Sequence, residues 1–170
     1  MTTVAYAAVT QSGLSFDRQL WMRPEIIPGL RRLTDAIHAE GAAAGIQLGH
    51  CGNMSHKSIC GCMPVGASSG FNLYSPTFVR GLRADELPEM ARAYGRSVNL
   101  AREAGFDSVE IHAGHGYLIS QFLSPSTNHR KDEFGGSLQN RMRFMDMVME
   151  EVMKAAGSDM AVLVKMNMRD

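Results

Sequence analysis

Residues 110–136 read EIHAGHGYLISQFLSPSTNHRKDEFGG. The stretch begins inside FDSVEIH (106–112), a short and mostly apolar run that predicts a buried strand. Directly where this strand would end, the chain places His112, His115 and Tyr117. In a barrel of parallel strands, the carboxyl ends of the strands and the loops after them build the active site. The stretch therefore indicates an α/β protein with hydrogen-bonding and titratable groups at the end of a parallel strand.

The same alternation of strand and helix extends in both directions from this segment. The predicted strands cover residues 1–9, 44–50, 106–112 and 160–166, and the predicted helices cover 24–40, 85–104 and 137–156. This order argues for a parallel sheet covered by helices. Two architectures fit it, an open doubly wound sheet or a section of a (β/α)8 barrel.

Two features of the sequence bear on this choice and on the location of function. No G-x-G-x-x-G follows a predicted strand and no Walker sequence is present, which weighs against an open sheet that binds a nucleotide. The segment from about 51 to 84 is rich in Gly, Ser, Pro and Asn. It is too long for a plain connection, so we expect it to have a functional role.

The composition is that of an ordinary soluble globular protein, with 45% hydrophobic and 20% charged residues among 170. Lys+Arg and Asp+Glu both number 17, so the zero net charge gives no electrostatic basis for binding nucleic acid or an anionic membrane. No run of about 18 apolar residues occurs, and the start, MTTVAYAAVT, lacks the basic residues of a signal peptide. Three cysteines, an odd number, indicate a reducing compartment, most simply the cytoplasm.

Polar residues stand near the ends of the other predicted strands as well. Gln47 and His50 lie in or just after one strand, and Lys165 lies within the last. Each alone could be a satisfied core residue, but together with the histidines and tyrosine of 112–117 they should converge on one cavity. Imidazoles can donate to one oxygen, a tyrosine can donate a proton, an amide can pair with a heterocycle, and a lysine can stabilise an anion. The set suits a cofactor that becomes anionic and a substrate carbonyl that becomes enolate-like.

Two long segments carry a specific resemblance. EIHAGHGYLISQFLSPSTNHRKDEFGGSLQNRMRF resembles the signature of the old yellow enzyme family of FMN-dependent NAD(P)H:flavin oxidoreductases. IPGLRRLTDAIHAEGAAAGIQLGH is similar to the second helix and third strand of that family. The resemblance covers almost the whole chain and is weakest around 51–84. It implies a partial (β/α)8 TIM barrel, from about strand two to strand five.

The resemblance also implies the residues that would bind FMN. Gln47 matches the glutamine that hydrogen-bonds the pyrimidine edge of the flavin, and Ala5 falls in the second strand, whose backbone approaches the flavin. Lys165 stands where the family usually has an arginine near flavin N1 and O2. A lysine provides the same positive charge but lacks the planar guanidinium group, which can donate two parallel hydrogen bonds. Asn53 stands where many relatives have an arginine.

The substrate side is implied in the same way. His112 and His115 match the pair that holds the substrate carbonyl or phenolate oxygen, and Tyr117 matches the tyrosine that protonates the α-carbon. The implied enzyme is an ene-reductase: NAD(P)H reduces FMN, and the flavin then passes hydride to the C=C bond of an α,β-unsaturated carbonyl compound. The alternative parent is a multi-centre enzyme resembling 2,4-dienoyl-CoA reductase or trimethylamine dehydrogenase, with 4Fe-4S and FAD and an enoyl-CoA-like substrate.

The extent of the resemblance sets expectations for the molecule as a whole. We expect residues 1–170 to form a single incomplete FMN-binding barrel domain that lacks the first strand and the C-terminal half. The complete parent is expected to be a homo-oligomer that acts on a small molecule. The 170-residue chain by itself is expected neither to bind FMN tightly nor to turn over, because an opened barrel exposes strand edges and half of its core.

The remaining reactive groups allow a different class of function. HCGNMSHKSICGC (50–62) holds two histidines and three cysteines, which are zinc-ligand types, but their spacing fits no standard finger. We therefore predict no metal site, with a metal-binding or non-catalytic fragment as the alternative. Arg130, Asp132 and Arg141, in the polar part of the signature, are predicted to form a structural network that fixes the loop.

Overall fold

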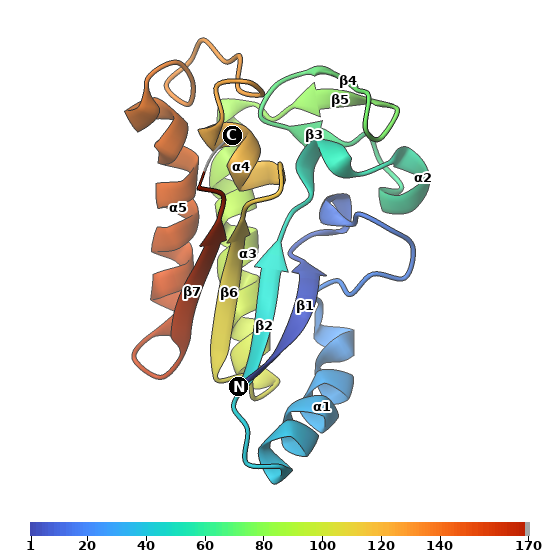
Figure 1. The fold of residues 1–170 in the computed structure, drawn as a ribbon, viewed down its shortest axis with the longest axis vertical. Helices are drawn as coiled ribbons and strands as arrows, with labels where there is room; N and C mark the ends of the chain where they lie inside the picture. The colour runs from blue at the N-terminus through green and yellow to red at the C-terminus, as the bar shows by residue number, and fades with distance from the viewer. Residues whose placement is uncertain (169–170) are drawn as a thin grey trace.

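Four parallel strands form the main sheet of the computed structural model, which describes residues 1–168 (Figure 1). The strand order is β1-β2-β6-β7, so the strands lie side by side in the order of the chain. Their bounds are Thr2–Ala8 for β1, Ala44–Gly49 for β2, Ser108–Ala113 for β6 and Ala161–Met166 for β7. All four predicted strands are therefore confirmed, with ends that shift by one or two residues.

Three long helices connect these strands, as predicted. They are α1 (Ile27–Ala39, preceded by the 3-10 turn Pro24–Ile26), α3 (Leu87–Glu103, preceded by the 3-10 turn Ala84–Glu86) and α5 (Leu138–Ala156). α3 packs against both α1 and α5. One further helix, α4 (Leu118–Leu123), follows β6 directly and was not predicted, since it is too short to show a helical period in the sequence.

The helices cover one face of the sheet only. Side chains on that face, including Ile46, Leu48, Val109 and Ile111, are fully buried. On the opposite face, Gln47 is only half-buried. An open doubly wound sheet has helices on both faces and a reversal in strand order. Sequential order with helices on one side is instead the wall of a (β/α)8 barrel, so the prediction of a partial barrel is confirmed.

The helix ends follow from their local sequences. Ser137 caps α5 by accepting a hydrogen bond from the Asn140 backbone N–H at 3.2 Å. Gly41 adopts a left-handed φ of 73° just beyond α1, which glycine tolerates at the end of a helix. Within α1, the apolar Leu33 is 41% exposed, whereas the neighbouring Thr34 is buried. Thr34 can be buried because its hydroxyl donates to the carbonyl of Ala104 at 2.6 Å.

The long segment after β2 folds into a small unit of its own above the carboxyl ends of the main strands (Figure 1). Its elements are the 3-10 turn Gly52–Met54, α2 (Lys57–Cys60), β3 (Val65–Gly66), β4 (Gly70–Asn72) and β5 (Thr77–Gly81). β5 lies between β3, to which it is parallel, and β4, to which it is antiparallel. The segment is thus a structured excursion at the end of the barrel that carries the predicted site.

No helix within residues 1–168 combines the length and the apolar composition that crossing a membrane requires.

Candidate active site

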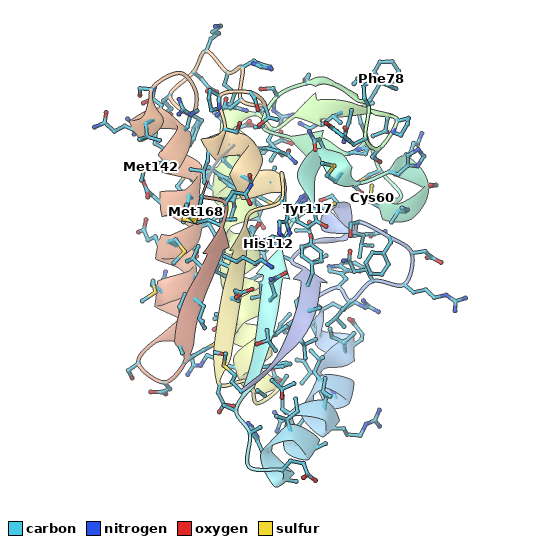
Figure 2. The ribbon with its side chains drawn as sticks, in the orientation of Figure 1. Cys60, Phe78, His112, Tyr117, Met142 and Met168 are labelled. Atoms are coloured by element: carbon cyan, nitrogen blue, oxygen red, sulfur yellow. The ribbon has the colours of Figure 1, made fainter. Side chains whose placement is uncertain are left out.

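The rings of His112, near the end of β6, and of His115 and Tyr117, just after it, form one cluster. Figure 2 shows His112 and Tyr117 together at the carboxyl end of the sheet. The His112 ring lies 4.8 Å, between centroids, from both the His115 ring and the Tyr117 ring. A tight turn makes this possible, because His115 and Gly116 both adopt left-handed φ values, of 55° and 70°. The structure thus brings the three predicted substrate-side residues together.

The environment of His112 sets its charge and its tautomer. Burial, with smaller contributions from the charges of His115 and Lys165, lowers the pKa of His112 to about 4. The ring is therefore neutral at physiological pH. Its Nδ1 accepts a 3.4 Å hydrogen bond from the Gly114 backbone N–H, which places the ring proton on Nε2. A neutral imidazole with an Nε2–H is a hydrogen-bond donor, as a carbonyl oxygen requires.

Tyr6 on β1 is a member of this cluster that the sequence analysis missed. Its ring lies edge-on to Tyr117 at 5.2 Å and to His112 at 6.1 Å. Its hydroxyl donates to the Gly13 carbonyl at 2.7 Å, and burial raises its pKa well above the usual tyrosine value. The Tyr6 hydroxyl proton is therefore already used in a hydrogen bond, whereas the Tyr117 hydroxyl has no hydrogen-bond partner among residues 1–168. In the sequence, only the presence of a large polar ring, Tyr6, in a strand of small apolar residues could have indicated this role.

The predicted cofactor-side residues lie on the open face of the same sheet. Lys165 on β7 stands directly opposite His112 in the strand register, and its side chain is exposed. Gln47 on β2 stands opposite Glu110, and its amide Nε2 donates to a Glu110 carboxylate oxygen at 2.5 Å. Ala5 is exposed on β1, where the register with β2 shifts. Strands β2, β6 and β7 therefore place amide, carboxylate and ammonium groups on a face that no helix covers.

His50 does not join this face, contrary to the expectation that it would converge with the others. It is fully buried, and its Nδ1 accepts from the Gly52 backbone N–H at 2.9 Å. Its Nε2 lies 3.0 Å from the hydroxyl of Ser12, in the loop after β1. Burial lowers the pKa of His50 to about 3, so it is a neutral link between two loops. The alternative of a satisfied core residue was correct here.

Comparison with known proteins decides the family. The sequence pattern of the NADH:flavin oxidoreductase / NADH oxidase family matches residues 1–170. The chain belongs to this flavin oxidoreductase family. It is 42% identical, over its whole length, to 4,4'-dithiodibutanoate disulfide reductase of Rhodococcus erythropolis, of which it covers 42%. It is 38% identical over 89% of its length to putative 12-oxophytodienoate reductase-like protein 1 of Arabidopsis thaliana, of which it covers 49%.

A solved member of the flavin oxidoreductase family has the same fold. The old yellow enzyme homologue from Zymomonas mobilis superposes with a TM-score of 0.87 at 32% identity. The superposition covers 95% of this chain and 49% of that one. The chain thus spans about half the length of these three relatives, or somewhat less.

The family implies FMN, and the open face of this sheet fits one side of a flat heterocycle. Gly45 and Gly49 alternate with Gln47 on that face and carry no side chain. A Cβ at Gly49 would approach the Tyr6 ring to 2.6 Å, so glycine there makes room for that ring at the end of the face. Gln47 supplies an amide for a ring edge, and Lys165 supplies a positive charge.

Gln121, on α4, holds the turn after β6 in place, and the sequence analysis missed it too. It is buried, and its amide nitrogen donates to the carbonyl of Gly116 at 2.6 Å and to Asn53 Oδ1 at 2.9 Å. The amide oxygen accepts from the Asn53 backbone N–H at 3.3 Å. Gly52, with φ of 62°, is packed so closely that a Cβ would come within 2.4 Å of this amide. Gln121 therefore joins the turn after β6 to the loop after β2.

The charged part of the family signature forms the predicted structural network. Arg130 donates to the backbone carbonyls of Ala67 and Leu82 and pairs with Asp132 at 2.5 Å. Its side chain is only 9% exposed. Arg141 donates from Nε to the last carbonyl of α4 at 2.6 Å. The Arg130 contacts attach the loop between α4 and α5 to the excursion between β2 and α3, and the Arg141 contact joins α5 to α4.

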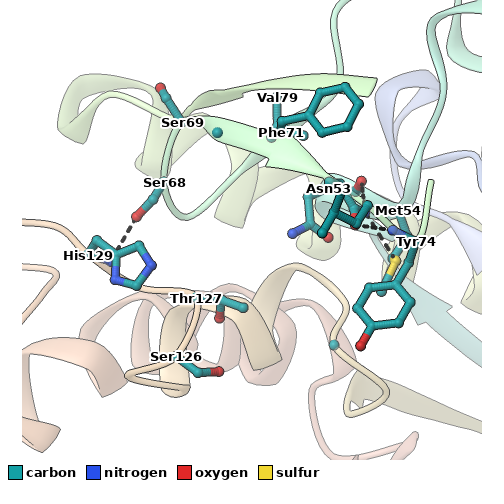
Figure 3. Close-up of a pocket in the computed structure, with 14 residues that line it drawn as sticks. Asn53, Met54, Ser68, Ser69, Phe71, Tyr74, Val79, Ser126, Thr127 and His129 are labelled. Carbon is teal, nitrogen blue, oxygen red and sulfur yellow. Dashed lines mark hydrogen bonds between the residues drawn. The ribbon is translucent and has the colours of Figure 1, made fainter. Parts of the chain in front are cut away.

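A cavity of about 460 Å³ lies between that excursion and the α4–α5 loop (Figure 3). Gly116 lies in its wall, so the cavity begins beside the turn after β6. One side is largely apolar and the other carries hydroxyl and imidazole groups. The apolar side includes Met54, Phe71, Leu73, Tyr74 and Val79, and the polar side includes Ser68, Ser126, Thr127 and His129. The segment of weakest resemblance therefore supplies much of the space next to the cluster.

The three cysteines take no part in the cluster. Cys51 and Cys60 are buried and Cys62 is exposed, and all three are free thiols. Within residues 1–168, no group of three or more His, Cys, Asp or Glu side chains is arranged to hold a metal ion.

Proposed function

We propose that this chain supplies the substrate-reducing face of an FMN-dependent oxidoreductase of the ene-reductase type. The reductant is NAD(P)H and the acceptor is the C=C bond of an α,β-unsaturated carbonyl compound. The observation that carries the proposal is the arrangement of His112, His115 and Tyr117: imidazoles and one uncommitted phenol around a single point at the carboxyl end of β6. Family membership and the fit of the open face to a flavin support it.

The substrate oxygen would lie between the two imidazoles. His112 donates from Nε2 without carrying a charge, because its pKa is lowered to about 4. As negative charge develops on the oxygen, each well-placed donor stabilises the transition state by about 3 kcal/mol. When bound, FMN supplies the hydride that reaches the β-carbon. The Tyr117 hydroxyl then donates its proton to the α-carbon, and Tyr6 holds the Tyr117 ring in position.

The residues proposed to hold FMN are Ala5, Gln47 and Lys165. The Gln47 nitrogen is bonded to Glu110, so the Gln47 oxygen is the acceptor left for a ring N–H. The exposed ammonium of Lys165 would stabilise the negative charge of a reduced flavin.

Tyr117→Phe in the complete FMN-loaded protein tests this proposal. Reduction of an enone by the reduced enzyme should slow by roughly 10²–10⁴-fold, because the general acid is lost. FMN content and the rate of flavin reduction by NAD(P)H should be unchanged. Tyr6→Phe is the matched control and should stay within a few-fold of wild type, since the Tyr6 proton is bonded to Gly13. An unchanged enone rate in Tyr117→Phe would refute the assigned role.

A disulfide is the second candidate acceptor, favoured by the whole-chain match to a disulfide reductase. Hydride delivered to one sulfur breaks the S–S bond and releases one thiol and one thiolate. Because a thiol has a pKa of about 8.5, its thiolate is stable enough to leave without taking a proton from a tyrosine. Tyr117→Phe should therefore leave aliphatic disulfide reduction within a few-fold of wild type while it blocks enone reduction, and comparing wild-type rates on both acceptors decides between them.

The multi-centre alternative concerns the complete protein. Iron and acid-labile sulfide analysis, together with identification of the released flavins, separates an FMN-only parent from one that also carries 4Fe-4S and FAD. The proposed roles of His112, His115 and Tyr117 are the same in both.

A further inference from the structure

The segment after β2 contains two thiols that the proposed reaction does not use. Cys60 is the last residue of α2 and Cys62 follows two positions later. The Cys62 thiol donates to the Cys60 sulfur, with 3.6 Å between the two Sγ atoms. A disulfide needs the sulfurs at about 2.05 Å, so a small rotation of the side chains would join them.

The backbone between the two cysteines favours this approach. Gly61 adopts a left-handed conformation, φ 73° and ψ 2°, at the end of α2. The chain therefore turns sharply, and the two side chains face each other instead of pointing apart. Glycine is the residue that adopts this conformation without steric cost.

The two thiols differ in access, as an exchanging pair requires. Cys60 is 1% exposed, whereas Cys62 is exposed and lines a surface cavity of about 680 Å³ together with Arg80. An outside reagent can thus reach Cys62 first, and the buried Cys60 is in place as the second thiol.

We propose that Cys60 and Cys62 are a dithiol site that closes to a reversible intramolecular disulfide by exchange with a small-molecule disulfide of the glutathione class. Cys62 as thiolate attacks one sulfur of the reagent, its S–S bond breaks, and one thiol leaves. Cys60 then attacks the Cys62 sulfur of this mixed disulfide, and the second thiol leaves. Both cysteines are oxidised, the reagent is reduced to two thiols, and two protons pass to the products.

The third cysteine lies outside this chemistry. Cys51 is fully buried, and its thiol donates to the Leu14 carbonyl at 3.3 Å. Burial raises the pKa of Cys51 to about 12 and that of Cys62 to about 11, so Cys51 differs from Cys62 in its lack of access and not in the ease of forming a thiolate. It serves as an internal reference in the same chain. The inference does not depend on the proposed function.

Trypsin separates the relevant thiols. Residues 58–80 contain both Cys60 and Cys62, and residues 33–57 contain Cys51, because no Lys or Arg lies inside either stretch. The protein is incubated with oxidised glutathione at about pH 8.5, where more thiol is ionised than at pH 7. Exchange is then stopped with acid, and the protein is unfolded in urea so that buried thiols also react, alkylated, digested without reduction and measured by mass spectrometry. We expect the 58–80 peptide to lose both alkylation sites and two hydrogens, with Cys51 still a free thiol. Dithiothreitol should restore both sites.

Two variants test each half of the exchange. In Cys60→Ser, the mixed disulfide of glutathione with Cys62 should accumulate, because the second thiol is missing. In Cys62→Ser, the buried Cys60 should stay unmodified over the same period. Wild type that stops at the glutathione adduct, or that stays fully alkylated, would overturn the proposal. A link from Cys51 to either cysteine would do the same. Equal circular dichroism spectra of the three proteins show that the fold is retained.

Discussion

His50 and His112 show how burial gives one residue type two different uses. Both rings are neutral because burial lowers their pKa values, to about 3 and about 4. The difference lies in their hydrogen bonds. Both ring nitrogens of His50 have partners, Gly52 and Ser12, so His50 joins two loops and has nothing left to offer a ligand. His112 uses one nitrogen for Gly114 and keeps the other as a donor.

His50 should make the folded state sensitive to acid. Below about pH 6.5 the unfolded chain protonates this ring, while the folded chain resists protonation down to about pH 3. The unfolded state thus binds more protons than the folded state in this window. As the pH falls from about 6.5 towards 3, the contribution of His50 therefore lowers the free energy of unfolding by up to about 1.4 kcal/mol per pH unit. Above pH 6.5 the ring contributes no pH dependence.

Urea unfolding of wild type and His50→Gln at several pH values checks this expectation. The variant should lose stability at pH 7.5, because its contacts to Ser12 and Gly52 change, yet show a shallower decline between about pH 6.5 and 4. His129→Gln, at an exposed position, is the control and should keep the wild-type decline. Parallel declines in wild type and His50→Gln would contradict the assignment.

Among the elements, the loop between α4 and α5 is joined to the excursion by one side chain. The Arg130 guanidinium lies over the rings of Phe122 and Phe134, at 5.5 and 5.8 Å from their centroids. It also bonds Asp132 and two backbone carbonyls of the excursion. A planar fork can make these contacts at once, whereas a lysine ammonium cannot. The arrangement fixes the position of the α4–α5 loop relative to the excursion, and these two segments form the walls of the 460 Å³ cavity.

Arg130→Lys should therefore be more disruptive than its conserved charge suggests. Losing the fork leaves buried carbonyls and a carboxylate with fewer partners, which should lower the free energy of unfolding by about 2–4 kcal/mol. Arg143→Lys is the matched control, since Arg143 is exposed and makes one 3.4 Å contact to Asn140. Its effect should stay within about 0.5 kcal/mol. Equal denaturation midpoints for the two variants would argue against the network.

On the scale of the whole molecule, the sheet is open on one face and at both edges. β1 and β7 each pair with one neighbour in the main sheet. Apolar side chains of β7 are exposed, with Leu163 at 37%, Val164 at 39% and Met166 at 54%. A small-molecule site usually encloses most of its ligand, so a single open face provides about one side of an FMN site.

This shape predicts weak cofactor binding by the 170-residue chain alone. Titration of FMN fluorescence should give a Kd of about 10 µM or weaker, because only one face of the ring is covered. Gln47→Leu should weaken binding further, and Tyr117→Phe should leave it unchanged. A preparation that stays yellow, with one FMN per chain after gel filtration, would show that this expectation is wrong.

The sequence by itself determined the class of fold, the four strands and the kinds of polar side chain near the ends of these strands. Strand and helix patterns arise from local periodicity, and the motif from His112 to Tyr117 is contiguous in the chain. Only the tertiary structure decided which polar groups share a face. It brought Tyr6 against Tyr117, buried His50 among loops, and used Gln121 to join the turn after β6 to the loop after β2. These outcomes depend on the β1 irregularity and on contacts between residues distant in the chain, which no local pattern encodes.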